Sequence, residues 1–252
     1  MIEKIVTAAF VVIGDEILSG RTRDENVNFL ATGLGEVGIR LSEVRVVPDD
    51  ESEIIEAVNF LRQKFNYVFT SGGIGPTHDD ITAQSIAKAF GDQLVKNPEA
   101  VDALMQHHAS INVNEAYLKM ALIPSKGRLL DNSISSAPGF FVENVFVMAG
   151  VPKIFQVMFE ASKKEIIGGK KIKSQEIKVD LVESVIAKDL TKLQNDYPEV
   201  SMGSYPFSNE IKRGTSLVFR STDEKLIEQS VNEMVALLRD IKDGLEIIIT
   251  RD

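Results

Sequence analysis

Cysteine is absent from the 252-residue sequence, which excludes disulfide bonds, a thiol nucleophile and a thiolate metal site. Long apolar runs are also absent, because the run from Ala8 to Ile13 is too short to cross a membrane and leads into charged residues. Positive charge is not in excess: the formal net charge is -9, whereas nucleic-acid-binding surfaces are usually basic. We therefore expect a cytoplasmic protein without a signal peptide or transmembrane helix, which binds neither nucleic acid nor membranes.

What the sequence does contain is a regular alternation of strand and helix patterns. The apolar runs at residues 5–13, 39–47 and 67–71 are typical of strands that are buried on both faces. Each run is followed by apolar residues at helical spacing, as at Ile54 and Leu61. This alternation predicts βαβ units with right-handed crossovers and an α/β fold with a mainly parallel sheet.

Three polar loops follow these strands, at residues 14–24, 48–51 and 71–80. Each loop carries carboxylates, and two of them carry glycines. Ligands of open α/β sheets bind beyond the carboxyl ends of the strands, at the point where the strand order reverses. We therefore expect the three loops to meet at one edge of the sheet and to form a ligand site there.

The third loop is rich in glycine and reads Ser71-Gly72-Gly73-Ile74-Gly75-Pro76-Thr77-His78-Asp79-Asp80. Its main-chain amides, followed by the amino end of a helix, are suited to hold a phosphate group. The loop matches neither the dinucleotide-binding GxGxxG motif nor the Walker A motif. An ordinary strand-to-helix turn, in which Asp79 or Asp80 caps the helix, explains the same residues, and the loop alone supports both interpretations equally.

The rest of the chain does not continue this regular alternation of strand and helix patterns. Residues 97–119 are predicted to be helical, and two short apolar runs at residues 140–142 and 145–148 indicate a hairpin. Residues 168–252 follow the order β-α-β-β-α-β, which is typical of a small α+β ferredoxin-like domain. The glycine pair at its start marks the expected boundary between domains at residues 1–167 and 168–252.

Five short motifs follow one another within residues 5–160: Gly14-Asp15-Glu16-Ile17-Leu18-Ser19-Gly20, Pro48-Asp49, the segment from Ser71 to Thr82, Ala137-Pro138-Gly139-Phe140 and Gly150-Val151-Pro152. With these motifs the chain resembles the molybdopterin-binding (MoaB/MogA-like) superfamily. More narrowly, it resembles the amino-terminal domain of the competence/damage-inducible protein CinA and the molybdopterin-binding-like region of animal FAD synthases. The resemblance implies a three-layer α/β fold, a nucleotide or pterin phosphate as ligand, and a homo-oligomer.

The resemblance also implies roles for individual residues. The two aspartates that matter most in pterin-handling members correspond to Asp49 and Asp80. CinA-like members are associated with divalent-metal-dependent cleavage of ADP-ribose. We expect Asp80 and Asp49 to hold a divalent metal ion (Mg²⁺, Mn²⁺ or Co²⁺) or to position a water molecule, assisted by Asp79. The other expected ligand-binding residues are Gly14, Asp15, Glu16, Ser19, Gly20, Ser71, Gly72, Gly73, Gly75, Thr77, Asn132, Pro138 and Gly139.

The function predicted from these residues is that of a metal-dependent pyrophosphatase acting on a nucleotide diphosphate such as ADP-ribose or FAD. Two alternatives remain open: a molybdopterin-binding protein of molybdenum cofactor biosynthesis, and a binding module without catalytic activity. Plainer roles also remain open for several residues. Asp49 and Asp50 can cap the helix that follows them, and Asn132, Pro138 and Gly139 can simply shape a turn.

Overall fold

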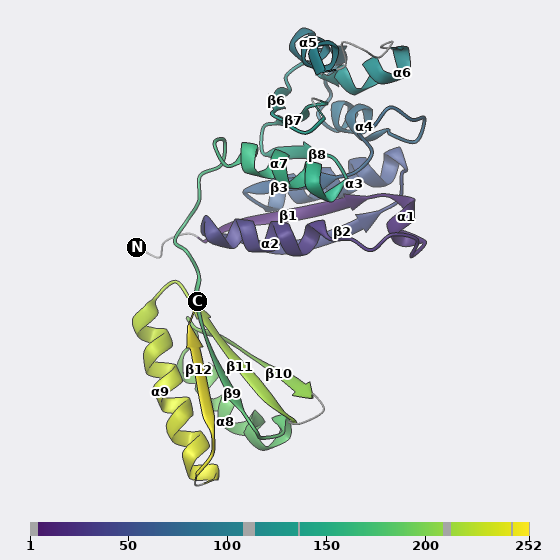
Figure 1. Ribbon diagram of the computed structural model, residues 1–252. Helices are drawn as coiled ribbons and strands as arrows, with labels where there is room; N and C mark the ends of the chain where they lie inside the picture. Colours follow the sequence, from purple (N-terminus) through teal and green to yellow (C-terminus); the bar gives the residue numbers. More distant parts are fainter. Residues whose placement is uncertain (1–4, 108–113, 136, 209–212, 243, 252) are drawn as a thin grey trace. The chain divides into compact units, whose positions relative to one another are not determined.

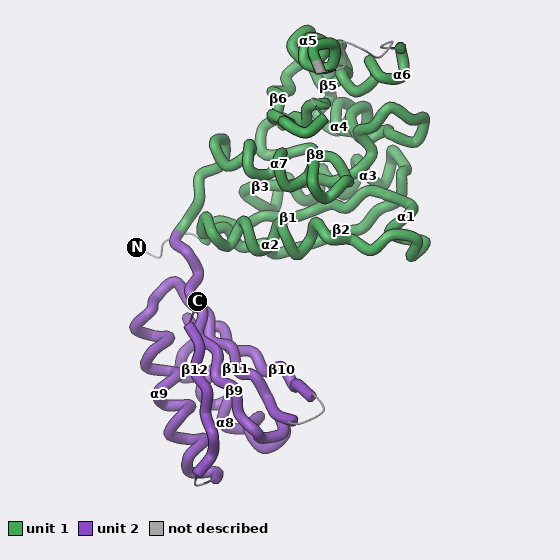
Figure 2. The backbone as a smooth tube through the Cα atoms, viewed as in Figure 1, with its two compact units in different colours: residues 1–169 green, residues 170–252 purple. Residues whose placement is uncertain are grey.

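The computed structural model describes residues 5–107, 114–135, 137–208, 213–242 and 244–251. The chain forms two compact units, Met1–Gly169 and Lys170–Asp252 (Figure 2). Each unit has a hydrophobic core of its own. No helix within these described ranges is long and apolar enough to cross a membrane.

The first unit is built on a six-stranded sheet with the order β2-β1-β3-β8-β7-β6 (Figure 1). Its strands are β1 (Val6–Ile13), β2 (Ile39–Val47), β3 (Tyr67–Ser71), β6 (Arg128–Leu130), β7 (Gly139–Val142) and β8 (Val145–Met148). The β1–β2, β1–β3 and β3–β8 pairs are parallel, whereas β7 runs antiparallel to both β8 and β6. The predicted mainly parallel sheet is confirmed, and so is the predicted hairpin, which is formed by β7 and β8.

Helices cover both faces of this sheet and make a three-layer fold (Figure 1). They are α2 (Asn26–Glu36), α3 (Glu51–Lys64), α4 (Thr82–Ala89) and α7 (Pro152–Ser162). Leu30 of α2 and Phe155 of α7 pack on the face that carries Phe10, while Ile54 of α3 packs on the face that carries Val11. Because alternate residues of β1 enter two different cores, its sequence is apolar without interruption.

A small lobe lies between α4 and β6 in the sequence. Its elements are β4 (Leu94–Lys96), α5 (Pro98–His107), α6 (Glu115–Leu118), the short 3₁₀ helix η1 (Lys119–Ala121) and β5 (Leu122–Pro124). Strands β4 and β5 pair antiparallel, and Ala100, Leu104 and Ala121 form a small core beside them. The predicted helical region 97–119 is therefore at least two helices, and its residues 108–113 lie outside the described part of the chain. Three-residue strands are too short to show a period in the sequence.

The second unit has the predicted order of elements. They are β9 (Lys173–Val179), α8 (Glu183–Asp196), β10 (Ser201–Ser208), β11 (Arg213–Ser221), α9 (Glu224–Ile241) and β12 (Ile247–Arg251). The strands form an antiparallel sheet with the order β10-β11-β9-β12, the arrangement expected of a ferredoxin-like fold. Ile186 of α8 and Met234 of α9 pack against Ile177 and Leu217 of the sheet. Both helices therefore cover the same face.

Candidate functional site

The carboxyl ends of β1, β2 and β3 meet at one edge of the first sheet. The chain passes from β1 to α2 on one face of the sheet and from β2 to α3 on the other. The amide of Gly14 donates a hydrogen bond to the carbonyl of Val47 (3.1 Å), which joins the first two loops. The glycine loop passes directly against the end of β1, since a Cβ atom on Gly72 would lie 2.1 Å from the carbonyl oxygen of Ile13. The predicted meeting of three loops is confirmed, at the place where open α/β sheets bind ligands.

The first loop is more ordered than its polar sequence indicates. Residues Asp15–Leu18 form a one-turn helix, α1, which places the exposed Asp15 and Glu16 at the rim. The carboxylate of Glu16 folds back over Gly14, where a Cβ atom would approach it to 2.4 Å. Ser19 and Gly20 follow as an exposed turn, with their amides bonded to the carbonyls of α1. These two predicted ligand-binding residues are not part of the pocket lining.

The glycine loop requires glycine for steric reasons. Gly72 and Gly73 have φ values of 99° and 65°, which side-chain-bearing residues rarely adopt. A Cβ atom on Gly73 would lie 2.2 Å from the hydroxyl of Thr82. That hydroxyl donates to the carbonyl of Gly72 (3.0 Å), and the Thr82 amide donates to the carbonyl of Gly73 (2.9 Å). The loop is thereby held against the first turn of α4.

Only some of the loop amides are free for a ligand. The amide of Gly72 donates to the carbonyl of Met148 (3.1 Å), so the prediction that this amide holds a phosphate is wrong. The amides of Gly73 and Gly75 donate to no other group in the described part of the chain. Ser71, at the end of β3, is buried and paired on both sides within the sheet. A phosphate at this loop would therefore meet two amides.

Thr77 organises the two aspartates that close the loop. Asp80 Oδ2 accepts hydrogen bonds from the amide (2.7 Å) and the hydroxyl (2.6 Å) of Thr77. Asp79 Oδ1 lies 2.5 Å from the same hydroxyl, and this contact lowers the pKa of Asp79 below its usual value. Helix α4 begins at Thr82 with Ile81 as its N-cap and without a side-chain cap. The interpretation of Asp79 or Asp80 as a helix cap is therefore wrong.

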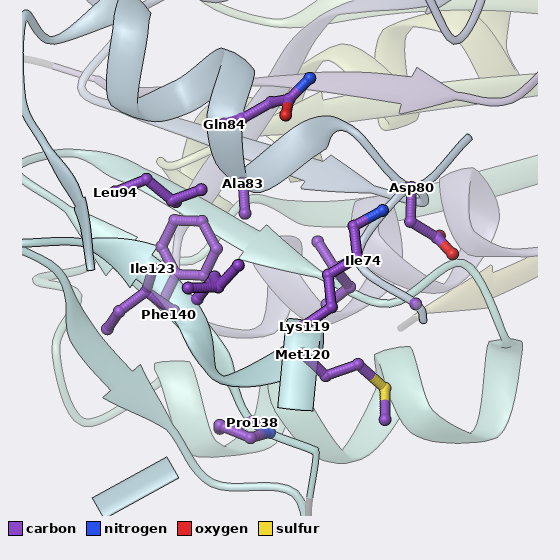
Figure 3. A pocket seen from close by; sticks show the side chains of 13 residues that line it. Ile74, Asp80, Ala83, Gln84, Leu94, Lys119, Met120, Ile123, Pro138 and Phe140 are labelled. Carbon is purple, nitrogen blue, oxygen red and sulfur yellow. The ribbon is translucent and has the colours of Figure 1, made fainter. Parts of the chain in front are cut away.

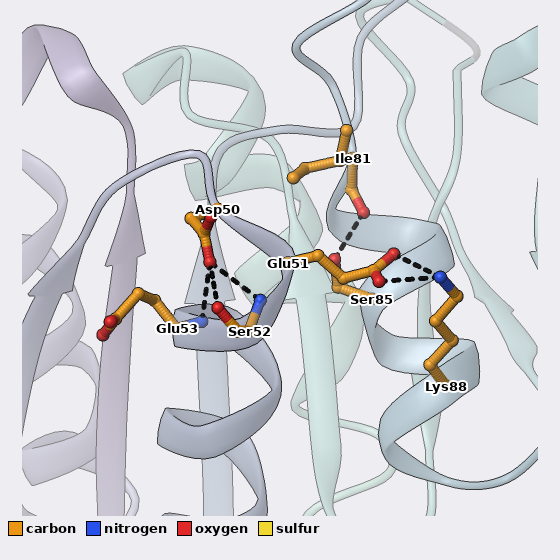
Figure 4. A network of polar contacts seen from close by, with 7 residues as sticks. All are labelled: Asp50, Glu51, Ser52, Glu53, Ile81, Ser85 and Lys88. Carbon is orange, nitrogen blue, oxygen red and sulfur yellow. Dashed lines mark hydrogen bonds and ion pairs between the residues drawn. The ribbon is translucent and has the colours of Figure 1, made fainter.

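Asp49 and Asp50 are neighbours in sequence but differ in their surroundings. Asp50 is the N-cap of α3, because its carboxylate accepts from the amides of Ser52 (2.9 Å) and Glu53 (3.2 Å) (Figure 4). The hydroxyl of Ser52 also donates to Asp50 and lowers the pKa of that carboxyl. The prediction that these aspartates cap the following helix is therefore confirmed for Asp50 but not for Asp49.

Asp49 instead faces the rim and accepts a hydrogen bond from the amide of Asp15 (3.0 Å). Burial raises the pKa of Asp49 above its usual value, and the carboxylates of Asp15, Glu16 and Asp79 raise it further. The bond from the Asp15 amide opposes this shift. The charges of the first and third loops therefore act on a half-buried carboxyl in the second loop, as expected for a cluster of like charges.

An ion pair joins the helices that follow the second and third loops. Both carboxylate oxygens of Glu51, in the first turn of α3, lie 2.7 Å from the Nζ atom of Lys88 in α4 (Figure 4). The contact connects α3 to α4 just behind the rim. It is a surface pair, so we regard it as a guide for the packing of these helices and not as a major source of stability.

A small pocket opens beside the glycine loop (Figure 3). It has a volume of about 50 Å³, well below the 300 Å³ or more of a pocket that encloses a small molecule. This volume is too small to enclose a whole nucleotide. The lining residues are Gly73, Ile74, Gly75, Asp80, Ala83, Gln84, Leu94, Lys119, Met120, Leu122, Ile123, Pro138 and Phe140.

Lys119 is a pocket residue that the sequence patterns did not indicate. Its side chain extends from η1 past Ile74 toward Asp80 (Figure 3), and its Nζ atom donates a hydrogen bond to the carbonyl of Thr77. The ammonium group also helps to lower the pKa of Asp79. A cation therefore stands beside the free amides of the loop. It comes from the small lobe, 42 residues along the chain from Thr77, so no local motif links the two.

The predicted residues near 132–139 separate into different roles. The side-chain amide of Asn132 donates to Ser135 Oγ (2.7 Å) and to the carbonyl of Ala137 (2.9 Å), which shapes the turn. Asn132 does not line the pocket. Pro138 does line it, whereas Gly139 is buried in β7, where a Cβ atom would lie 2.7 Å from the carbonyl of Val147. Gly139 thus allows close packing of two strands.

The rim carries several carboxylates, whose oxygens are ligands that divalent cations such as Mg²⁺ prefer. Within the described ranges, no three His, Asp or Glu side chains are grouped to hold an ion by themselves. Mg²⁺ is commonly bound by one or two carboxylates together with water and substrate phosphates, and it prefers oxygen ligands. That Asp49 and Asp80 hold a divalent ion therefore stays a prediction; burial and the neighbouring carboxylates raise the pKa of Asp49, and a bound cation would offset this effect.

Comparison with known proteins connects both units to described families. Residues 9–168 match the family described as "Probable molybdopterin binding domain", and residues 171–242 match the family described as "FAD synthase, middle domain". A protein of Archaeoglobus fulgidus is 32% identical over 231 residues, which cover 91% of this chain and 97% of that protein. The "Probable FAD synthase" of Caenorhabditis elegans is 32% identical over 92% of this chain, which spans half (50%) of the length of that protein.

A solved structure of the protein CinA from Thermoplasma acidophilum is similar in fold to this chain. It shares 33% sequence identity and a TM-score of 0.60, and the match covers 64% of this chain and 98% of the solved one. The matched family model spans well over half of the sequence. This chain therefore belongs to the molybdopterin-binding domain family and is related to CinA and to the FAD synthases.

Proposed function

We propose that this protein is a metal-dependent pyrophosphatase that acts on a nucleotide diphosphate such as ADP-ribose or FAD. The observation that carries the proposal is that acidic side chains and a lysine occur together at one edge of the sheet. The half-buried Asp49 lies near the carboxylates of Asp15, Glu16 and Asp79, while Lys119 lines the pocket together with Gly73, Gly75 and Asp80. A diphosphate is the ligand that needs both acidic groups for a cation and amides for its own oxygens.

In the proposed reaction, a water oxygen forms a bond to one phosphorus while the bridging oxygen leaves with the other phosphate. Lys119 and the amides of Gly73 and Gly75 would bind phosphate oxygens and stabilise the charge that develops on them. Asp49 would act as a ligand of a divalent ion and not as the base, and the proton of the attacking water would pass to the solvent. Bound by Asp49 and Asp80, a divalent ion would neutralise phosphate charge and lower the pKa of water.

The test is the release of AMP from ADP-ribose, FAD and NADH, each with Mg²⁺, Mn²⁺ or Co²⁺, measured by chromatography. We expect Asp49→Asn and Asp80→Asn to lower the rate about a hundredfold or more. Lys119→Gln should raise KM about tenfold with a smaller effect on kcat, because it removes a charged contact to phosphate.

The matched control is Asp50→Asn, which removes one negative charge next to Asp49 but keeps a good helix cap on α3. This variant should release AMP at the wild-type rate. If no substrate gives AMP with any ion, or if Asp80→Asn is as active as Asp50→Asn, the pyrophosphatase proposal is overturned.

Binding of molybdopterin is the second candidate function, and the match of residues 9–168 to the molybdopterin-binding family favours it. A pterin phosphate would use the same amides and Lys119, and no water would need to be activated. The two candidates differ in the outcome of a gene deletion. Loss of molybdoenzyme activity in the deletion strain, with pterin fluorescence in the purified protein, would support the carrier role. Normal molybdoenzyme activity would contradict it.

A further inference from the structure

The sheet of the second unit has one face that its own helices do not cover. Register pairs place Tyr205 opposite Ser216, and Ser216 opposite Lys178, on this face. The neighbouring residues in each strand, such as Leu217 and Ile177, face α8 and α9. The open face contains a hollow of about 620 Å³, within the size range of small-molecule sites. It is lined by Glu176, Lys178, Tyr205, Pro206, Phe207, Ser216, Val218 and Arg220.

Two aromatic rings lean over glycines on this face. A Cβ atom on Gly203 would lie 2.9 Å from the hydroxyl of Tyr205 and 3.0 Å from its ring. A Cβ atom on Gly214 would lie 2.7 Å from Cζ of Phe207. Because Gly203 and Gly214 have no side chain, both rings can lie close to the sheet. Tyr205 still keeps 49% of its surface exposed, so a planar group can stack on it.

Among the described residues of this face, Arg220 is a cation without a paired carboxylate, whereas Lys178 pairs with Glu176. Glu176 accepts hydrogen bonds from Ser216 Oγ (2.5 Å) and Thr250 Oγ1 (3.1 Å), and Lys178 lies 3.2 Å from the same carboxylate. Glu176 is therefore occupied by groups of its own sheet. The guanidinium of Arg220 lies 3.4 Å from the hydroxyl of Tyr205, and no carboxylate pairs with it in the described ranges.

We propose that this hollow binds a mononucleotide, whose aromatic ring stacks on Tyr205 while its phosphate pairs with Arg220. Arginine binds phosphate by paired hydrogen bonds, and stacking on an aromatic side chain tolerates any planar base. The chain's net charge of -9 disfavours an extended polyanion at this place, so a single nucleotide is the occupant. This site lies within the second unit and does not depend on the function proposed for the first.

Flavin mononucleotide is a suitable probe, because stacking of its ring quenches its fluorescence. We expect the full-length protein to bind it, with Tyr205→Leu and Arg220→Gln each weakening binding at least tenfold. Tyr205→Phe keeps the ring and should bind within about threefold of wild type. Riboflavin has no phosphate, so Arg220→Gln should not change its binding.

Two controls separate this site from the rest of the molecule. Arg213→Gln removes an exposed arginine of β11 that is not part of the hollow, and Lys119→Gln alters the pocket of the first unit. Both should bind the probe like wild type. Unchanged binding in Tyr205→Leu would overturn the proposal, and so would a loss in Lys119→Gln instead. Tenfold tighter binding of a thymidine decamer than of the probe would also overturn it.

Discussion

At the scale of single residues, the pair Asp49 and Asp50 shows how position decides chemistry. Asp50 is exposed, accepts from the first turn of α3, and has a lowered pKa. Asp49 is half-buried, lies near Asp15, Glu16 and Asp79, and has a raised pKa. One carboxylate is thus satisfied by its own helix, while the other keeps a charge that a cation or a proton would stabilise.

The raised pKa of Asp49 predicts how stability depends on pH. Below the pKa of an unfolded aspartate, about 3.9, the group is neutral in both states and costs nothing. As the pH rises through the higher folded-state pKa, ionisation disfavours the folded protein. Asp49→Asn removes this cost and can keep the bond from the Asp15 amide. We expect the variant to have the larger free energy of unfolding at pH 7, and the difference to vanish near pH 3.5.

Urea denaturation of the two proteins in the presence of a chelator measures this difference. Addition of Mg²⁺ should then stabilise the wild type more than the variant, since only the wild type keeps both acidic ligands. A variant that is less stable than wild type at pH 7, with chelator, would contradict the assigned environment of Asp49.

At the scale of elements, the glycine loop depends on the absence of side chains. A Cβ atom on Gly72 would meet the main chain of β1 at 2.1 Å, and φ is 99° there. We expect Gly72→Ala to lower the free energy of unfolding by about 2–4 kcal/mol, measured by urea denaturation. Gly35 is the matched control, because it lies in α2 with no atom within 4 Å of its added Cβ.

Gly35→Ala should raise the free energy of unfolding by about 0.5–1 kcal/mol, because alanine loses less backbone freedom in a helix. Opposite signs for the two glycine variants are the decisive result. Equal effects would mean that the loop can relax away from the end of β1.

At the scale of the whole molecule, the two units have separate cores. Phe219, in the core of the second unit, and Phe69, in the first, are both fully buried at 0% exposure. Phe219→Ala should lower the stability of its own unit by about 3–5 kcal/mol and leave the other unchanged. Differential scanning calorimetry should show two transitions, of which only one moves. A single transition that moves as a whole would contradict independent units.

The scale of the whole molecule also explains which predictions succeeded. The alternation of apolar runs predicted the parallel sheet, because buried strands and amphipathic helices are encoded by nearby residues. The order of elements in the second unit followed for the same reason. The strands β4 and β5 have three residues each and carry no such pattern, so the lobe that they build was missed.

The sequence by itself determined the longer strands and helices, their order, and the three loops that end at one sheet edge, since local periodicity and glycine placement suffice for these. Tertiary structure alone decided three features of the rim. The amide of Gly72 donates a hydrogen bond to the carbonyl of Met148, Asp49 and not Asp50 lies near the other carboxylates, and Lys119 lies beside the glycine loop. These features depend on contacts between residues far apart in the chain, and such contacts exist only after the strands and helices have packed.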